Sequence, residues 1–173
     1  ARKRARNMVA DGADILDIGG ESTRPGAVTV NVDEEIERIL PVIAAIRADV
    51  ATPISIDTRK ARVAQAALDA GASMVNDVSA FLFDPDMARV TALAGAPCCL
   101  MHAQGDPATM QVSPTYDDVT LDVYDFLEGR IQKAEEAGIR RDQIIVDPGI
   151  GFGKTQDHNL TLLKNLSIFH GLG

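Results

Sequence analysis

Cysteine is scarce in this sequence, and its two cysteines stand next to each other as Cys98 and Cys99. Adjacent cysteines inside an apolar run cannot build a disulfide framework, and no Cys and His spacing typical of a metal site is present. We therefore expect a protein of the reducing cytoplasm, with no complete set of metal ligands within these 173 residues.

Basic charge is also in short supply, with 17 Lys and Arg residues against 25 Asp and Glu residues. Nucleic-acid-binding domains usually carry a basic face, so we expect no nucleic-acid partner. The short basic run at residues 2–6 is read as a solvated helix face. No apolar run approaches the roughly 20 residues of a membrane span, and we see no signal peptide. We therefore expect no membrane contact.

Hydrophobic residues make up 46% of the sequence, which is enough to form the core of one domain. Short β-branched runs alternate with helical patterns, which predicts repeated βαβ units and a parallel sheet. Pro41 stands inside the second helical pattern and is expected to kink or split it near Leu40. The predicted strands are 13–20, 53–57, 73–78, 97–102 and 143–147, and the predicted helices are 1–10, 31 onward, 62–70, 84–94, 117–137 and 157–166.

Each predicted strand is followed or ended by a polar side chain, in order Glu21, Asp57, Asn76, His102 and Asp147. Ligands of parallel α/β folds bind at the carboxyl ends of the strands. Five polar strand ends suit a (β/α) barrel better than a Rossmann sheet. Because a complete barrel needs eight strands and about 250 residues, we predict a partial TIM (β/α)8 barrel with about five strands present. Residues 1–173 would then form one incomplete domain, an internal fragment of the barrel.

A glycine-rich stretch follows Asp147 and ends in Gly-Lys-Thr at residues 153–155. It is not a P-loop, because that motif requires a glycine five residues before Gly153, and Pro148 stands there. The glycines instead suggest close backbone approach to a ligand, with Phe152 and Lys154 free to cover it.

Three of the strand-end residues, Asp57, Asn76 and Asp147, suit a nitrogen-rich heterocycle. A carboxylate can accept two N–H bonds from a guanidine-like ring edge, and an Asn amide can both donate and accept. Each residue also has a structural alternative: Asp57 could cap a helix, and Asn76 and Asp147 could form turns.

The polar loop at residues 21–27 is a candidate anion site. Arg24 could bind a phosphate bidentately, Thr23 could donate its hydroxyl, and Pro25 limits the flexibility of the loop. The alternative is a solvated surface turn. At the end of the fourth strand, Met101 is expected to pack against a ligand ring or the core, and His102 is either a structural residue or a general base.

These stretches together resemble the dihydropteroate synthase family. The resemblance runs in family order along almost the whole chain. It rests on Asp17-Ile-Gly-Gly-Glu-Ser-Thr-Arg-Pro-Gly-Ala27, Ser55-Ile-Asp-Thr58 with Lys60, Val75-Asn-Asp-Val78, Leu100-Met-His102 with Gln104-Gly105, and Asp147-Pro-Gly-Ile-Gly-Phe-Gly-Lys154.

The resemblance implies a TIM-barrel homodimer of the folate pathway. Such an enzyme condenses 6-hydroxymethyl-7,8-dihydropterin pyrophosphate with p-aminobenzoate by an SN1-like reaction, giving 7,8-dihydropteroate and pyrophosphate with help from Mg²⁺. Carried over by motif, the pterin site would be Asp57, Asn76 and Asp147, with Met101 lining it. The mobile loop would contribute Thr23, Arg24 and Pro25, and the second-substrate side Gly151 and Phe152. Catalysis would fall to Asp57, Asn76, Asp147 and Arg24.

Other parts of the family's site lie outside these residues. The Asn that binds Mg²⁺ would precede Ala1, and a Lys and an Arg-x-His pair would follow Gly173, so we expect the fragment alone to be inactive. Two other classes stay open. One is a pterin-binding barrel that passes a methyl group from methyltetrahydrofolate to a corrinoid, which has no reason to keep the Thr-Arg-Pro-Gly loop. The other is a non-catalytic paralogue.

Overall fold

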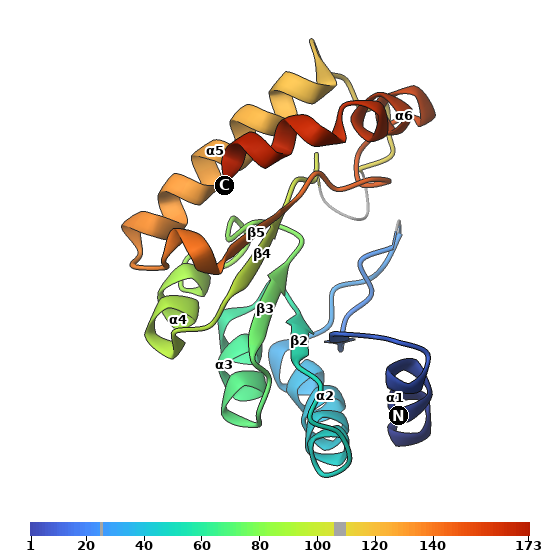
Figure 1. The fold of residues 1–173 in the computed structure, drawn as a ribbon, viewed down its shortest axis with the longest axis vertical. Helices are drawn as coiled ribbons and strands as arrows, with labels where there is room; N and C mark the ends of the chain where they lie inside the picture. Colours follow the sequence, from blue (N-terminus) through green and yellow to red (C-terminus); the bar gives the residue numbers. More distant parts are fainter. Residues whose placement is uncertain (25, 106–109) are drawn as a thin grey trace.

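The computed structural model describes residues 1–24, 26–105 and 110–173, and they contain a five-stranded parallel sheet. Every strand pairs with the one before it, so the order is β1-β2-β3-β4-β5 (Figure 1). This confirms the predicted strands and suits a barrel, whose neighbouring strands follow each other in sequence. The strands are β1 (Leu16–Gly19), β2 (Ile54–Asp57), β3 (Met74–Asp77), β4 (Cys98–Met101) and β5 (Ile144–Asp147).

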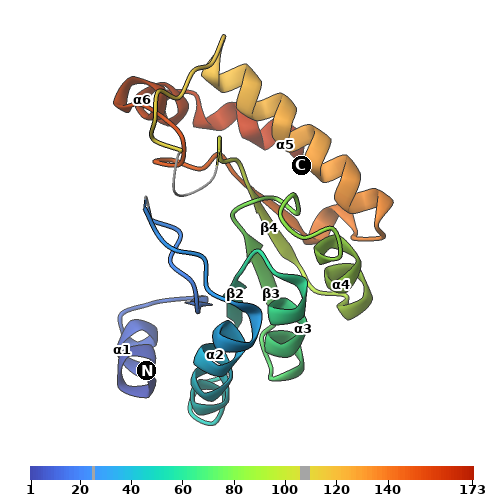
Figure 2. The same ribbon diagram turned by 180° about the vertical axis from the view of Figure 1, so that it is seen from behind.

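Helices follow the strands as predicted, and α2, α3 and α4 stand side by side along one face of the sheet (Figures 1 and 2). Helices α5 and α6 contact each other beyond the β4–β5 end. None of the helices in the described part of the chain is long and apolar enough to cross a membrane. The helices are α1 (Arg2–Ala10), α2 (Val32–Arg47), α3 (Ala61–Asp69), α4 (Met87–Ala94), α5 (Val119–Glu136), α6 (Gln156–Lys164) and the 3₁₀ segments η1 (Arg141–Gln143) and η2 (Leu166–Leu172).

Helix α2 begins where its cap was predicted, because the Asn31 side chain accepts a hydrogen bond from the Glu34 N–H at 2.9 Å. The expectation that Pro41 splits this helix is wrong, since α2 is continuous for 16 residues. Proline removes one backbone bond, and the burial of Ile39 and Ile43 against the sheet offsets that loss.

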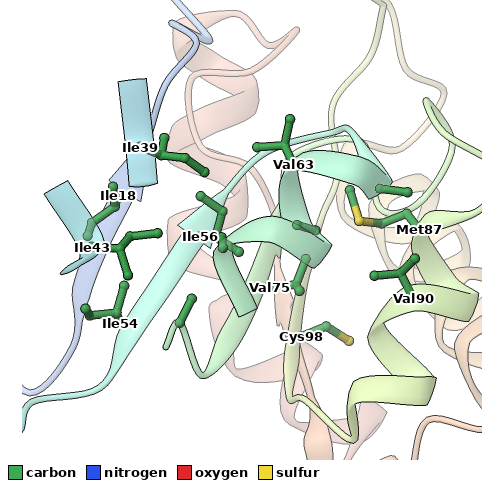
Figure 3. Close-up of a cluster of buried hydrophobic side chains, with 14 of the residues drawn as sticks. Ile18, Ile39, Ile43, Ile54, Ile56, Val63, Val75, Met87, Val90 and Cys98 are labelled. Carbon is green, nitrogen blue, oxygen red and sulfur yellow. The ribbon is translucent and has the colours of Figure 1, made fainter. Parts of the chain in front are cut away.

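The core lies between the sheet and helices α2, α3 and α4. Figure 3 shows Ile18, Ile54 and Ile56 from the strands packed against Ile39 and Ile43 of α2. Burying each such side chain contributes about 1.5–3 kcal/mol. A second apolar cluster joins α5 to α6 and η2. The strand at the β5 edge is less buried than its sequence suggests, since Ile145 is 48% exposed.

Because alternate residues of a strand face opposite sides, the residues between these core positions share the other, inner face of the sheet. Strand β1 shows the alternation clearly, with Leu16 and Ile18 buried and Asp17 and Gly19 exposed. The inner-face positions are Asp17, Gly19, Ser55, Asp57, Met74, Asn76, Cys99, Met101, Ile145 and Asp147.

Candidate active site

Strand pairing brings the predicted ring-binding residues together on the inner face. Asp57 lies opposite Gly19 on one side and opposite Asn76 on the other, and Met101 lies opposite Asp147. Asn76 pairs with Cys99, which in turn pairs with Ile145, two residues before Asp147. The parallel register therefore places Asp57, Asn76, Met101 and Asp147 on one face at the carboxyl edge, as the sequence predicts.

Asp57 is the most unusual of these side chains. Its Oδ1 atom is buried, and it has no hydrogen-bond partner within the described residues. Burial, and then the negative charges of Asp17, Asp77 and Glu35, raise the pKa of Asp57 to about 7. The helix-cap alternative is wrong, because the residue at the N-cap of α3 is Lys60. Such a carboxyl group is suited to a ligand that donates N–H bonds.

Asn76 has a partner that the sequence analysis missed. Its Nδ2 atom donates to Asp17 Oδ2 at 3.4 Å, a long bond across the inner face. One row deeper, the Ser55 hydroxyl oxygen is buried and has no partner among the described residues. Ser55 lies directly opposite Asp17 in the register. Asp17 and Ser55 could have been predicted from the alternation of side chains along a strand. That alternation places Asp17 on the same face as Gly19, and Ser55 on the same face as Asp57.

Asp147 forms the turn that its sequence allowed, and its role in ring binding stays a prediction. Its Oδ1 atom accepts the Gly149 N–H at 2.8 Å, so the turn alternative holds for that oxygen. The carboxylate still stands at the inner face beside Met101, which is 4% exposed. Asp147 is therefore fixed in orientation by its own turn before any ligand arrives.

The glycines after Asp147 serve a different purpose from the one expected. At Gly149, φ is +68° and an added Cβ would lie 1.9 Å from the carbonyl oxygen of His102. At Gly153, an added Cβ would lie 2.5 Å from the carbonyl oxygen of Gln104. The expectation of close approach to a ligand is corrected here: these two glycines let the loop pack on the segment after β4. Only Gly151 faces open space.

Lys154 is likewise not free to cover a ligand, because it is 3% exposed. Its Nζ atom donates to the Phe152 carbonyl at 2.9 Å and lies 2.9 Å from Nδ1 of His102. Burial lowers the pKa of Lys154 to about 8, and burial followed by the Lys154 charge lowers the pKa of His102 to about 4. His102 also packs edge-on against Phe126, with 4.8 Å between ring centroids. The geometry favours the structural alternative for His102.

Phe152 lines an open pocket of about 360 Å³ that also includes Ser79, Phe83 and Met110. The Arg59 guanidinium forms part of the wall and lies 4.3 Å from the centroid of the Phe83 ring. The pocket thus joins the loops that follow β2, β3, β4 and β5, on the side where the second substrate was expected.

The loop between β1 and α2 carries the predicted anion-binding residues, and it projects from the sheet (Figures 1 and 2). Arg24 is exposed and lines a separate hollow with Thr29 and Arg38. Its side chain makes no hydrogen bond or ion pair to any residue that the structure describes. Thr23 is half-buried, and Pro25 lies outside the described residues. The structure therefore does not bring Arg24 against Asp57, Asn76 or Asp147.

Metal-ligating side chains are not clustered in the described part of the chain. Within residues 1–24, 26–105 and 110–173, no group of three or more His, Cys, Asp or Glu side chains could hold a metal ion. The expected Mg²⁺ therefore stays a prediction.

A five-stranded parallel α/β sheet with polar side chains on its inner face is typical of barrels that bind small molecules, and comparison with known proteins shows the family. The profile of the pterin binding enzymes matches residues 1–173, so the chain belongs to that family.

The individual relatives are more specific. The chain is 48% identical over 169 residues to the dihydropteroate synthase of Synechocystis sp., covering 98% of this chain and 58% of the relative. Two solved structures are of Xanthomonas albilineans dihydropteroate synthase. The structure with 4-aminobenzoic acid superposes with a TM-score of 0.93 at 45% identity, covering 99% of this chain and 60% of that one. The complex with 7,8-dihydropteroate superposes with a TM-score of 0.87 at 40% sequence identity. That match covers 99% of this chain and 59% of the other. The chain thus spans about three fifths of these relatives.

Proposed function

We propose that the protein to which these residues belong is a dihydropteroate synthase. It joins 6-hydroxymethyl-7,8-dihydropterin pyrophosphate to p-aminobenzoate and releases pyrophosphate. The observation that carries the proposal is Asp57, whose buried oxygen has no partner in the described chain and lies in register with Asn76. Relatives of known structure that hold 4-aminobenzoic acid or 7,8-dihydropteroate support the choice of substrates.

The proposed chemistry follows from the charges on the inner face. Asp57 and Asp147 accept N–H bonds from the pterin ring, and Asn76 completes the set with an amide that both donates and accepts. In an SN1-like reaction the pterin methylene becomes cationic as pyrophosphate leaves. Two fixed carboxylates stabilise that positive charge electrostatically. Met101 and Phe152 contribute apolar walls for the pterin and for the aminobenzoate.

The leaving group requires positive charge on the other side of the site. Arg24 supplies it from the β1–α2 loop, where its guanidinium is exposed, and Thr23 adds a hydroxyl. The condensation requires no nucleophile from the protein, because the aniline nitrogen of p-aminobenzoate attacks the cation. Gly151 belongs to the side of the second substrate, and Pro25 lies outside the described residues.

Five further features belong to the same proposal. The complete protein would be a cytoplasmic homodimer, and Mg²⁺ would assist through a ligand outside these residues. Neither nucleic acid nor a membrane would be a partner. The two free thiols, Cys98 and Cys99, are consistent with a reducing compartment.

The proposal is tested by replacing Asp147 with Asn in the full-length protein. The loss of one charge-assisted contact to the pterin should lower kcat/KM by roughly 100-fold, or several kcal/mol of transition-state stabilisation. Asp33→Asn, on the exposed side of α2, is the matched control and should leave turnover unchanged. Near-normal turnover of Asp147→Asn would refute the assignment.

A binding experiment separates the proposed function from the two alternatives. Titration with the pterin pyrophosphate ester and with methyltetrahydrofolate should show tight binding of the ester only. Preference for methyltetrahydrofolate would point to the corrinoid methyltransferase class. Binding of the ester without any condensation by the full-length protein would point to a non-catalytic paralogue.

A further inference from the structure

Glu21 stands at the base of the loop that carries Thr23 and Arg24, and both of its carboxylate oxygens are occupied. Oε2 accepts the backbone N–H of Val30 at 2.7 Å, which joins the two ends of the loop. Oε1 accepts a hydrogen bond from Arg59 at 2.7 Å, and the ammonium of Lys60 donates to Oε2 at 2.7 Å. In the sequence, Glu21 is one more polar residue that follows a strand. In the structure, its side chain is almost completely buried.

Glu21 is one member of a buried cluster of four charges. Lys60 donates a second hydrogen bond to Glu35, whose side chain is 0% exposed and sits on the buried stripe of α2. The side chains of Glu21 and Lys60 are each 7% exposed, and that of Arg59 is 8% exposed. These four side chains comprise two carboxylates and two cations. Removing one member would leave a buried charge without its counterion.

The cluster connects this loop directly to the strand end that holds Asp57. Thr58, Arg59 and Lys60 follow Asp57 without a gap, and the Thr58 hydroxyl donates to Glu35 at 2.7 Å. On the loop side, Gly20 packs so closely on Glu35 that an added Cβ would lie 2.8 Å from its Cγ. The start of the loop and the turn after β2 are therefore held by the same two carboxylates.

Beyond this base, the loop has few anchors. Val28 is 85% exposed, and Arg24 makes no side-chain hydrogen bond to the described residues. Within the described residues, the position of Arg24 relative to Asp57 therefore depends mainly on the base of the loop, where Glu21 binds it. Reactions that rely on placed charges lose rate steeply when a group shifts by about 1 Å.

Given the proposed function, we propose that Glu21 is a positioning residue, which sets the β1–α2 loop relative to Asp57 through Lys60 and Glu35. It does not touch the substrate. Its role is to hold the base of the loop, so that Arg24 meets the pyrophosphate of a pterin that Asp57 has already bound.

Hydrogen exchange of the ligand-free full-length protein tests the tether without any substrate. In Glu21→Gln, which keeps the shape of the side chain but not its charge, amides 22–24 and 26–30 should exchange at least about tenfold faster. The amides of β2, β3 and β4 should be unchanged. Asp33→Asn is the matched control, since Asp33 and Arg62 also join α2 to α3 by an ion pair of 3.1 Å, but with side chains 78% and 71% exposed. It should change neither set of amides.

Steady-state kinetics then tests the positioning role. Glu21→Gln should raise KM for the pterin pyrophosphate about tenfold or more, while the affinity for a pterin without pyrophosphate changes less than about twofold. Glu21→Asp keeps the charge but shortens the reach, so it should show a smaller shift in the same direction, even if Glu21→Gln does not fold.

Three results would decide against the proposal. Unchanged exchange of amides 22–24 and 26–30 would show that Glu21 is no tether, and equally faster exchange throughout the chain would show a purely structural role. Faster loop exchange with unchanged kinetics would remove the positioning role. A wild-type protein that binds no pterin ester would instead refute the proposed function, and the exchange result would still report on the tether.

Discussion

The two halves of the sheet's carboxyl edge differ in whether their polar groups have hydrogen-bond partners within the chain. On the β2 side, Asp57 Oδ1 and the Ser55 hydroxyl are buried without partners in the described chain. At β4 and β5, Asp147 is held by Gly149, Lys154 is held by His102 and Phe152, and the Tyr116 hydroxyl donates to the Gly153 carbonyl at 2.7 Å. Within the described residues, the first half leaves buried polar atoms unpaired, whereas the second is a rim held by hydrogen bonds within the chain, in which Gly149 engages Oδ1 of Asp147.

This difference indicates which half of the edge should contribute most of the free energy of ligand binding. Unpaired buried polar groups lower the stability of the ligand-free protein and make a complementary ligand bind more tightly. A fully paired rim contributes to the stability of the fold and presents a fixed wall. Substitutions in the two halves should therefore change stability in opposite directions.

The largest effect is expected at the rim, from Gly149→Ala. The new Cβ would meet the His102 carbonyl at 1.9 Å in a residue with φ of +68°, so the free energy of unfolding should fall by about 4 kcal/mol or more. Gly151→Ala is the matched control, with φ of +88° but nothing within 4 Å, and should lose only about 1 kcal/mol. Urea denaturation measures both, and equal losses would contradict the close packing.

A smaller effect is expected from Lys154→Met, which keeps the length of the side chain and removes its donors. The carbonyls of His102 and Phe152 would lose their hydrogen bonds, at a cost of roughly 2 kcal/mol. Lys133→Met, at an exposed pair with Glu136, should change stability by less than about 0.5 kcal/mol. Thermal unfolding of the two variants distinguishes them, and a neutral Lys154→Met would show that the rim does not depend on this amine.

The smallest effect has the opposite sign and comes from the ligand half. Asp57 has a pKa of about 7 in the folded protein against 3.8 as its ordinary value. Between these values the folded state binds more protons than the unfolded state, so the stability that Asp57 contributes falls as pH rises through 7. Asp57→Asn lacks this loss and should be more stable than wild type by about 1 kcal/mol at pH 8, and by less at pH 5.

Denaturation of Asp57→Asn at the two pH values provides the measurement, with pterin binding as the companion assay. The variant should gain stability while it loses affinity for the ring. A variant that is less stable than wild type at pH 8 would mean that Asp57 is paired within the chain, and the contrast between the two halves would fail.

Much of this arrangement could be predicted from the sequence, because it depends on local patterns. The alternation of strands and helices, the cap at Asn31 and the carboxyl ends at Asp57, Asn76 and Asp147 all follow from short-range rules. Parallel pairing of consecutive strands then places these residues at the same edge of the sheet.

The misses share one physical cause, which is that burial of a charged side chain depends on partners distant in sequence. Lys154 looked like a free cation until His102 enclosed it, 52 residues away. Glu35 is fully buried on α2, where Lys60, 25 residues away, pairs with it. The steric need for Gly149 also comes from a neighbouring strand. None of these contacts leaves a signal within a window of a few residues.

The alternation along β4 has one more consequence, for the adjacent thiols. Cys98 is 0% exposed among the core side chains in Figure 3, whereas Cys99 is half-buried on the inner face next to Asn76. Burial raises the pKa of both to about 12, so both react slowly with alkylating reagents. Ring binding should further slow the modification of Cys99, while Cys98 becomes accessible only on unfolding. One strand thus carries two chemical reporters, one for occupancy of the site and one for integrity of the fold.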